Sequence, residues 1–321
     1  MAELEDIFDG ELAAPRLIGK SLGAAALRRV LEAHQAWLER RQHGLRACLK
    51  GIVLADAVLE GQNLERADLQ SANFIDAHMS RVNLSGANLK FADLSNATLI
   101  EADLSATDLT DAKLELALLA AANLSEARLC RASFRGANLR AARLPDASME
   151  QCDFTGTVLR DASLHQAKAF ECNFTKVDFT DSKLYHATFR YCRLQGIAAS
   201  GSIWSTATLQ GCEFRGADLS GAQFDRCDLG QSSFWNANLR GGSFQQARLQ
   251  GVDLEAADLS GARFHESITM GANFCRADLR GANGLTPTQL SRARTDSRTI
   301  LPDGSRGPYM LGSAAHLPVR R

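Results

Sequence analysis

Residues 134–144 read FRGANLRAARL, and this short stretch contains the pattern that decides the fold. A large apolar residue returns at every fifth position, here beginning with Phe134, and a small residue usually stands two positions before it. The series runs from Leu49 to Leu279 without a slip, and 44 of its 47 positions carry Leu, Phe, Met or Trp. The three exceptions are Ala169, Ala199 and Thr269. Internal repetition of this length indicates architecture more strongly than any local motif.

A period of five fits neither a straight strand nor an α-helix. Residues five apart point to opposite faces of a strand and lie about 140° apart around a helix. The large and the small residue of each pentad can both face inward only if the chain turns once per pentad. Four turns close a coil of about twenty residues, and stacked coils satisfy each other's backbone groups at about 4.8 Å per rung. The sequence therefore predicts an all-β solenoid of about twelve coils, roughly 56 Å long.

The five-residue series should fill the interior of this solenoid. Leucines twenty residues apart are expected to form a vertical file, with phenylalanines stacked on another side. The predicted core is represented by Leu104, Leu124, Leu144, Phe134, Phe154 and Phe174. The Asp or Asn that often precedes the large residue is expected to form hydrogen bonds at the corners.

The repeat resembles that of the pentapeptide-repeat proteins, whose motif is Ala-(Asp/Asn)-(Leu/Phe)-X-X. The stretches ADLSGARF (257–264) and FRGANLRAARL (134–144) carry the likeness, which covers about three quarters of the chain. The resemblance implies a right-handed quadrilateral β-helix. For some members it also implies mimicry of duplex DNA and binding to DNA gyrase.

Composition bounds the classes of function. The net charge of the chain is −1, and our counts give −6 for residues 51–285, +1 for residues 1–50 and +4 for residues 286–321. No apolar run approaches the ~18–20 residues of a membrane helix, and the acidic start MAELEDIFDGEL does not resemble a signal peptide. We therefore expect a cytoplasmic protein without membrane insertion or direct nucleic-acid binding.

The ends of a solenoid need covering, because an open coil exposes apolar side chains and unpaired backbone. We expect a disordered N-terminus (1–15), a helical N-terminal cap (16–45), the repeat solenoid (46–284), a C-terminal cap (285–304) and a disordered basic tail (305–321). Residues 21–42 are predicted to form an amphipathic helix capped by Ser21, with His34 at the edge of its apolar stripe and its polar tip in water. This helix either covers the first coil or docks a partner. Thr286 to Gln289 form a capping box that should start a short helix, and residues 298–304 could add a last strand.

Most cysteines fall at the small inward position. These are Cys152, Cys172, Cys192, Cys212 and Cys227. The first four are twenty residues apart and should form one interior column. Sulfurs in a line at about 4.8 Å per rung cannot surround one tetrahedral zinc ion, so we interpret them as apolar fillers and expect neither metal nor cofactor. Cys130 and Cys275 should face outward and react with a thiol probe.

Aromatic and basic residues gather on two adjacent coils beside Ala169. We place His165, Tyr185 and His186 on one outer face, and Phe170, Arg190 and Tyr191 on the next. Phe170 is expected to turn inward and fill the space that Ala169 leaves. If it stays outside, these six residues are the best candidate interaction patch, because exposed aromatic residues with Arg mark binding hot spots.

No motif for catalysis is evident: the chain lacks a Gly-rich phosphate loop, a zinc-binding His pair and a nucleophile elbow. We therefore expect a non-catalytic rigid scaffold that presents flat faces to a protein partner. One alternative is a DNA-mimicking modulator or protector of DNA gyrase, from which the weak charge and basic C-terminus depart. Another is an adaptor or passenger in a bacterial secretion or envelope pathway. The sequence identifies neither the partner nor the oligomeric state.

Overall fold

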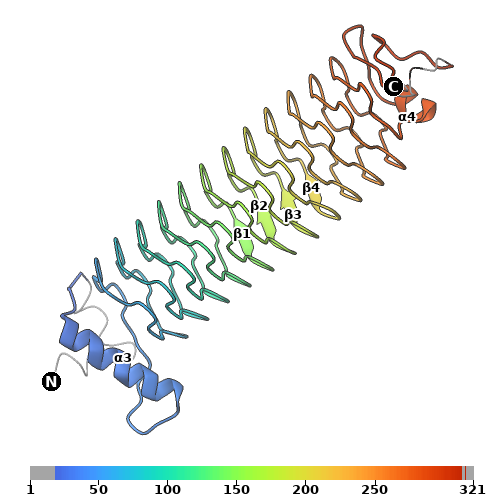
Figure 1. Ribbon diagram of the computed structural model, residues 1–321. Coiled ribbons are helices and arrows are strands. Elements are labelled where there is room, and N and C mark those ends of the chain that lie inside the picture. The colour runs from blue at the N-terminus through green and yellow to red at the C-terminus, as the bar shows by residue number, and fades with distance from the viewer. Residues whose placement is uncertain (1–18, 313–314, 316–321) are drawn as a thin grey trace. The chain divides into compact units, whose positions relative to one another are not determined.

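The computed structural model describes residues 19–312 and 315, which fall into two compact units, Met1–Val158 and Leu159–Arg321. Unit 1 contains helix α3 (Ala24–Leu38) and strand β1 (Ser148–Glu150). Unit 2 contains strands β2 (Lys168–Phe170), β3 (Thr188–Arg190) and β4 (Thr208–Gln210) and helix α4 (Pro287–Ser291). Each unit is described by itself (Figure 1).

Both units are parallel β-solenoids in which residue i pairs with residue i+20. In unit 1 Asp103 bridges Asn123, and the backbone N–H of Leu104 donates to the carbonyl of Asn123 at 2.7 Å. In unit 2 Asp218 bridges Asn238 in the same parallel sense. Most of these contacts are single bridges at the middle of a side, because each side of a coil is too short for a longer strand. The backbone is therefore satisfied mainly between neighbouring coils.

The chain turns at each pentad through a four-residue β-turn. At one such corner the N–H of Ala57 donates to the carbonyl of Leu54 at 3.2 Å, and Asp56 has φ +57°. A positive φ at the third residue is the signature of a type II turn. Gly, Asn and Asp suit this position because they tolerate the left-handed region.

The side chains just before the large residues support these corners as expected. The carboxylate of Asp103 accepts from the backbone N–H of Ser105 at 2.9 Å, which is an Asx-type bond. The same Oδ1 accepts from the side-chain amide of Asn123 in the next coil at 3.0 Å. These carboxylates are thus occupied by structural hydrogen bonds at the corner and between coils.

The interior is lined by the five-residue series. All six residues chosen to represent the core are fully buried: Leu104, Leu124, Leu144, Phe134, Phe154 and Phe174. In unit 1 the rings of Phe134 and Phe154 stack with centroids 4.8 Å apart. In unit 2 the buried Trp204 contacts four phenylalanine rings. The same unit contains the two small interior residues Ala169 and Ala199, which are also buried.

The N-terminal helix is shorter than predicted, and two residues play other roles. Helix α3 begins after Gly23, which provides no side-chain cap, so Ser21 is not the N-cap. Ser21 instead forms a parallel bridge with Val53 and extends the solenoid surface. His34 is fully buried rather than wet at its tip, because the helix lies close enough for its Nδ1 to accept from the backbone N–H of Ala47 at 3.1 Å. The expected disordered segment 1–15 lies outside the described residues.

The C-terminal end closes with a modified coil. Thr286 and Gln289 form the capping box, with Pro287 as the first helical residue of α4. Ile300 bridges Asp278 in parallel and Arg306 in antiparallel orientation, which supplies a last β segment. The tail expected to be disordered from residue 305 begins instead with ordered contacts, because the chain reverses at Gly304 and Gly307 donates to Thr299 at 2.9 Å. Its final residues, 316–321, lie outside the described part.

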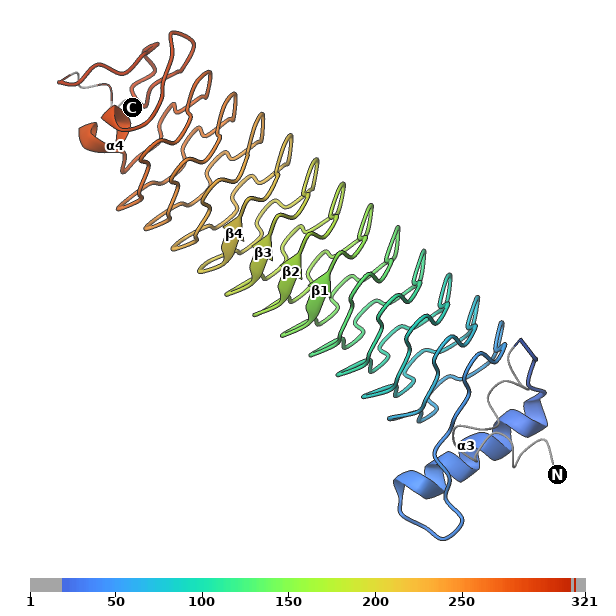
Figure 2. The same cartoon turned by 180° about the vertical axis from the view of Figure 1, so that it is seen from behind.

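Strands β2, β3 and β4 lie side by side in consecutive coils of unit 2 (Figure 2). They pair in parallel register, with Lys168 opposite Thr188 and Thr188 opposite Thr208. In each strand only the middle residue is buried, so the flanking side chains form one regular outer face. Within residues 19–312, neither helix has the length and apolar content that a membrane crossing requires.

Candidate functional site

The candidate site is the outer face of β2 and β3 with its two edges, which we call the β2–β3 face. One edge is the corner that precedes the strands, where His165, Tyr185 and His186 lie. The other edge is the strands' C-terminal end, where Phe170, Arg190 and Tyr191 lie. The two groups of three therefore flank one face rather than occupying two successive faces, because the strands between them are only three residues long.

Phe170 faces outward, and the expectation that it turns inward is wrong. Its side chain is 38 % exposed, whereas Ala169 is 2 % exposed. Phe170 is the last residue of β2, where side chains alternate between outside, inside and outside. Turning Phe170 inward would break this alternation and the pairing of Phe170 with Arg190 in β3. Strand register therefore decides its direction, and the gap beside Ala169 does not.

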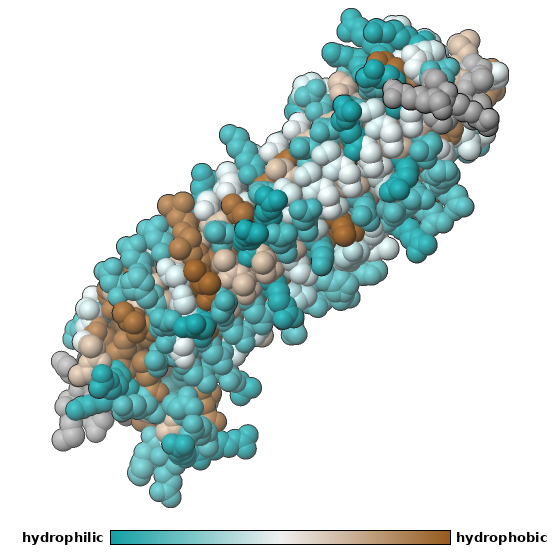
Figure 3. Space-filling view, viewed as in Figure 1, coloured by the Kyte–Doolittle hydropathy of each residue, from teal (hydrophilic) through white to brown (hydrophobic). Residues whose placement is uncertain are grey.

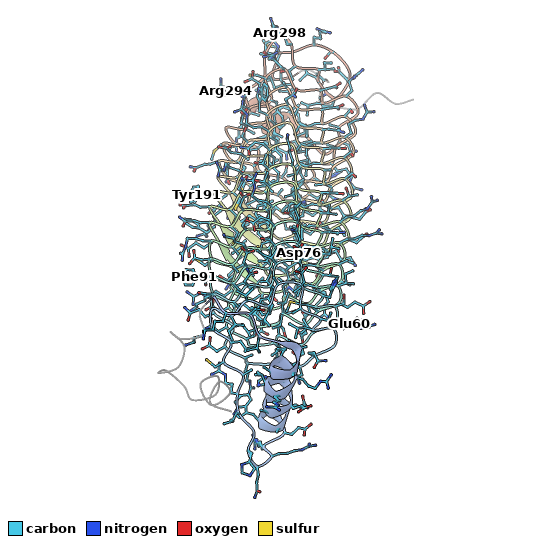
Figure 4. All side chains as sticks on the ribbon, turned by 90° about the vertical axis from the view of Figure 1, so that its left-hand side faces the viewer. Glu60, Asp76, Phe91, Tyr191, Arg294 and Arg298 are labelled. Atoms are coloured by element: carbon cyan, nitrogen blue, oxygen red, sulfur yellow. The ribbon has the colours of Figure 1, made fainter. Side chains whose placement is uncertain are left out.

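Phe170 and Tyr191 form an exposed aromatic pair. Their ring centroids are 6.0 Å apart and nearly perpendicular, and Tyr191 is 60 % exposed. Figure 4 shows Tyr191 extending away from the ribbon. Its ring lies against Gly211 in the next coil, where a methyl group would come within 2.7 Å of Cδ1. Gly211 therefore provides the space in which this ring lies close to the corner.

At the histidine edge of the face, His165, His186 and Thr206 contact one another in succession. The rings of His165 and His186 meet edge to face with centroids 5.5 Å apart. Nδ1 of His186 lies 2.7 Å from the hydroxyl of Thr206, and that hydroxyl donates to the carbonyl of Ser205. The imidazole of His186 and the hydroxyl of Thr206 are therefore within hydrogen-bond distance, and the tautomer of the ring determines which of the two donates. Thr206 has φ +65°, which is uncommon for a β-branched residue.

A polar groove of about 420 Å³ continues along the same edge beyond Thr206. It is lined by Ser205, Thr206, Asp225, Arg226, Gln245, Gln246, His265 and Glu266. Three of these side chains form a ladder, in which Nε of Arg226 donates to Gln246 at 2.8 Å and Gln246 donates to Glu266 at 2.6 Å. Neither this groove nor Thr206 is among the residues predicted from the sequence. Both could have been found from the coil length, because the residues that follow His186 at intervals of twenty lie beside it in successive coils.

The chemistry that this face offers is recognition by rings, a guanidinium and neutral hydrogen-bonding groups. It presents Phe170 and Tyr191 on one edge, and imidazole, hydroxyl and amide groups on the other. Large exposed rings together with Arg190 are typical of residues that dominate the energy of protein interfaces. Among residues 19–312, no three His, Cys, Asp or Glu side chains are arranged to hold a metal ion.

The stacked thiols behave as interior packing. Cys152 in unit 1 and Cys172, Cys192 and Cys212 in unit 2 are all buried. Contacts with Cys172 and Cys212, together with burial, raise the pKa of Cys192 far above its ordinary value. The thiol of Cys212 points to the carbonyl of Phe189 at 3.4 Å. Burial likewise raises the pKa of Cys227, so these groups stay protonated.

The outward thiols differ in their surroundings. Cys130 is partly exposed on unit 1, and Nη1 of Arg131 lies 3.3 Å from its sulfur. Arg131 also forms two hydrogen bonds to Asp111, and these lower the pKa of that carboxyl. Cys275 is partly exposed on unit 2, where burial raises the pKa of its thiol. The sequence alone could not show that Arg131 contacts this sulfur, because the same guanidinium also pairs with Asp111, twenty residues earlier in the chain.

The repeat and its coil define a β-solenoid of five-residue units, and comparison with known families agrees. The family model described as "pentapeptide repeat region" matches residues 122–199 and 207–283. A second, described as "pentapeptide repeats (8 copies)", matches residues 47–86 and 77–115. The chain belongs to the pentapeptide-repeat proteins.

Solved structures of other members resemble the chain in sequence pattern. HetL, a pentapeptide repeat protein involved in heterocyst differentiation regulation from the cyanobacterium Nostoc sp. strain PCC 7120, is 28 % identical, with 73 % of this chain and 91 % of that chain covered and a TM-score of 0.26. QnrB1, a plasmid-mediated fluoroquinolone resistance protein, is 19 % identical, with coverage of 53 % and 93 % and a TM-score of 0.23. A pentapeptide repeat protein from the Arabidopsis thaliana thylakoid lumen is 29 % identical, with coverage of 34 % and 68 % and a TM-score of 0.20. No curated protein sequence shows a significant match.

Proposed function

We propose that this chain is a non-catalytic scaffold whose repeat faces bind a protein partner. In this proposal the coils form a right-handed quadrilateral β-helix of about twelve coils, with caps at residues 16–45 and 285–304. The partner binds the β2–β3 face through the interaction patch of His165, Phe170, Tyr185, His186, Arg190 and Tyr191.

The observation that supports this proposal most is the outward aromatic pair of Phe170 and Tyr191. Exposed apolar surface gains free energy when it is buried, at about 25 cal/mol per Å². Gly211 holds the ring of Tyr191 close to the corner, and the T-shaped contact with Phe170 restricts both rings before any partner arrives. Pre-ordered rings lose less conformational entropy on binding than mobile ones.

Two further observations support the proposal. The outer polar residues repeat from coil to coil and are occupied in corner hydrogen bonds, as for Asp103, which favours a structural role over catalysis for them. All eight cysteines are free thiols, which favours a reducing compartment such as the cytoplasm.

The test is affinity capture with the full chain and two matched variants. We expect one protein to be retained by the wild type and lost with the double variant Phe170→Ala/Tyr191→Ala. Trp235→Ala is the control, because Trp235 is also an exposed aromatic residue of unit 2 but lies on a different side, beneath the guanidinium of Arg215. Retention of every captured protein by the double variant would contradict the proposal.

Two further experiments separate the narrower roles. A gyrase modulator would inhibit or protect purified DNA gyrase in a supercoiling assay. The β2–β3 face carries Lys168 and Arg190 beside its aromatic residues, whereas a duplex mimic needs a mainly acidic face. An adaptor that docks through α3 would lose its partner on deletion of residues 1–45 and keep it with the double variant.

A further inference from the structure

The exposed aliphatic side chains of unit 2 gather at its C-terminal end. Among the residues of unit 2 that the structure describes, four large aliphatic side chains are exposed: Ile268, Met270, Met310 and Leu311, at 45 %, 57 %, 68 % and 75 %. At this end Figure 3 shows small hydrophobic areas within a mainly hydrophilic surface. Exposed apolar side chains that lie close together are typical of an interaction surface.

The segment 292–295 joins the two halves of this apolar group. The backbone N–H of the residue after Met270 donates to the carbonyl of Arg292 at 2.9 Å. The N–H of the residue before Met310 donates to the hydroxyl of Thr295 at 3.0 Å. Met270 and Met310 therefore border the same short stretch of the last coil, and their exposed side chains belong to one surface.

Exposed arginines lie along the same stretch. Four of them form no ion pair or side-chain hydrogen bond within the described part of the chain: Arg292, Arg294, Arg298 and Arg306. The backbone of Arg306 bridges Ile300, which lies two residues after Arg298. Figure 4 shows Arg294 and Arg298 near the C-terminal end of the ribbon. We call these four arginines, together with the four aliphatic residues, the last-coil surface.

The acidic residues of this segment are bound to its backbone. The carboxylate of Asp296 accepts from the N–H of Arg298 at 3.1 Å, and that of Asp303 accepts from the N–H of Ser305 at 2.9 Å. They are also outnumbered, since residues 286–312 contain four arginines, two acidic residues and no lysine. The last-coil surface therefore combines a net positive charge with exposed apolar side chains.

An anionic lipid bilayer offers the complement of both features in one plane. Guanidinium groups bind phosphate and carboxylate oxygens in bidentate pairs, and lipid head groups present these oxygens at the membrane surface. Peripheral binding strengthens with the apolar area buried below the head groups and with electrostatic attraction to anionic lipids, and this surface supplies both contributions. A nucleic-acid backbone offers phosphates without an apolar layer, so it would leave the four aliphatic side chains in water.

We propose that the last-coil surface binds an anionic lipid bilayer peripherally. The arginines contact the head groups, and the aliphatic side chains enter the boundary between head groups and acyl chains. The anionic leaflet of a cell membrane faces the cytoplasm, which agrees with the reducing compartment that the free thiols favour. The proposal is independent of the partner assigned to the β2–β3 face.

The first test is co-sedimentation of the full chain with lipid vesicles. Vesicles of phosphatidylcholine with about one third phosphatidylserine should retain the chain, and vesicles of phosphatidylcholine alone should not. Raising the salt from about 0.1 M to about 0.5 M should weaken the binding, because it screens the arginines. Absence of binding to the anionic vesicles, or equal binding to both kinds, would overturn the proposal.

The apolar contribution is tested by Met310→Ser/Leu311→Ser. This double variant should bind the anionic vesicles roughly tenfold more weakly or worse, because it removes two side chains from the acyl boundary. Ile100→Ser/Leu118→Ser is the matched control, since both residues are exposed aliphatic residues of unit 1. An equal loss of binding in the two double variants would contradict the assignment to the last-coil surface.

The charged contribution is tested by Arg294→Gln/Arg298→Gln. This variant should also bind roughly tenfold more weakly or worse, and its remaining binding should depend less on salt. Arg160→Gln/Arg193→Gln removes the same charge from two exposed arginines elsewhere in unit 2 and should bind as the wild type does. Undiminished binding by the first variant would overturn the proposal. Circular dichroism and thermal unfolding identify any variant that fails to fold.

Two further measurements separate this proposal from others. Phe170→Ala/Tyr191→Ala should bind the vesicles as the wild type does, so the proposals for the two surfaces can fail separately. Labelled duplex DNA is the second probe. Binding of the DNA that is lost in Arg294→Gln/Arg298→Gln, without binding to vesicles, would assign the last-coil surface to nucleic acid and overturn the proposal.

Discussion

The ring of Tyr191 lies against Gly211 of the next coil and occupies space that a Cβ atom on this residue would need. A methyl group on Gly211 would lie 2.7 Å from Cδ1 and 2.9 Å from Cε1 of Tyr191. Leu116 and Gly136 repeat this relationship in unit 1, with 2.8 Å to Cδ2. A large outward side chain at a corner is thus accommodated by a glycine twenty residues later.

This relationship predicts the effect of Gly211→Ala. Gly211 has φ +63°, so an alanine there carries a left-handed strain of about 1 kcal/mol, and it must also displace Tyr191. Gly216→Ala is the matched control, because Gly216 has the same φ of +63° and nothing within 4 Å of a methyl group. Chemical unfolding should show a larger loss of stability for Gly211→Ala. Equal losses would mean that the ring does not lie where the structure places it.

The register of the repeat predicts a contrast between two leucines of unit 1. Leu104 is fully buried, whereas Leu118 is 42 % exposed. Leu104→Ala should cost about 2–5 kcal/mol through the cavity it leaves, and Leu118→Ala about half a kcal/mol or less. Thermal and urea unfolding measure both. A similar cost for the two variants would contradict the inward and outward assignment.

His34 predicts a pH dependence of the N-terminal helix. Burial lowers the pKa of its imidazole below 6.5, the charge of Arg46 acts in the same direction, and the backbone of Glu65 partly opposes both. Below about pH 6.5 the unfolded chain binds a proton that the folded chain excludes, so stability is present above this pH and falls as the pH drops through it.

Hydrogen exchange of α3 at about pH 7.5 and 5.5 measures this dependence. The amides of residues 27–38 should exchange faster, relative to their intrinsic rates, at the lower pH. His34→Leu keeps the apolar contact and removes the titration, so its protection should change less between the two pH values. The same pH response in both proteins would show that another group is responsible.

The free thiols should react in a definite order. Cys130 is partly exposed, while burial raises the pKa of Cys48 and of Cys275, and the remaining five thiols are buried. Alkylation at neutral pH, followed by peptide mass spectrometry, should label Cys130 first and the five buried thiols last. In urea all eight should react at similar rates. Early labelling of Cys192 in the folded chain would contradict the closed interior.

The repeat was predictable because a single period constrains every coil. Leu104 and Leu124 are buried because the chain turns once in every five residues. Their burial can be predicted from this period alone, without knowing which distant residues they contact. The capping box at Thr286 was readable for a similar reason, since its two hydrogen bonds join residues three apart.

The wrong predictions for His34 and Phe170 have different causes. The depth of His34 is set by Ala47, thirteen residues away, and helical periodicity cannot show how closely the helix approaches the first coil. Phe170 was assigned by the apparent gap at Ala169, although strand alternation already pointed it outward. Thr206 and Gly211 could have been found, because the coil of twenty residues places them beside His186 and Tyr191.

The central claim is that a protein partner binds the β2–β3 face, and a photo-crosslinking residue in place of Tyr191 tests it most directly. We predict that the full chain carrying the crosslinker at position 191 forms one discrete adduct with a partner, identified by mass spectrometry. The same crosslinker in place of Trp235 should not form that adduct. Identical adducts from both positions, or none from position 191, would contradict the claim.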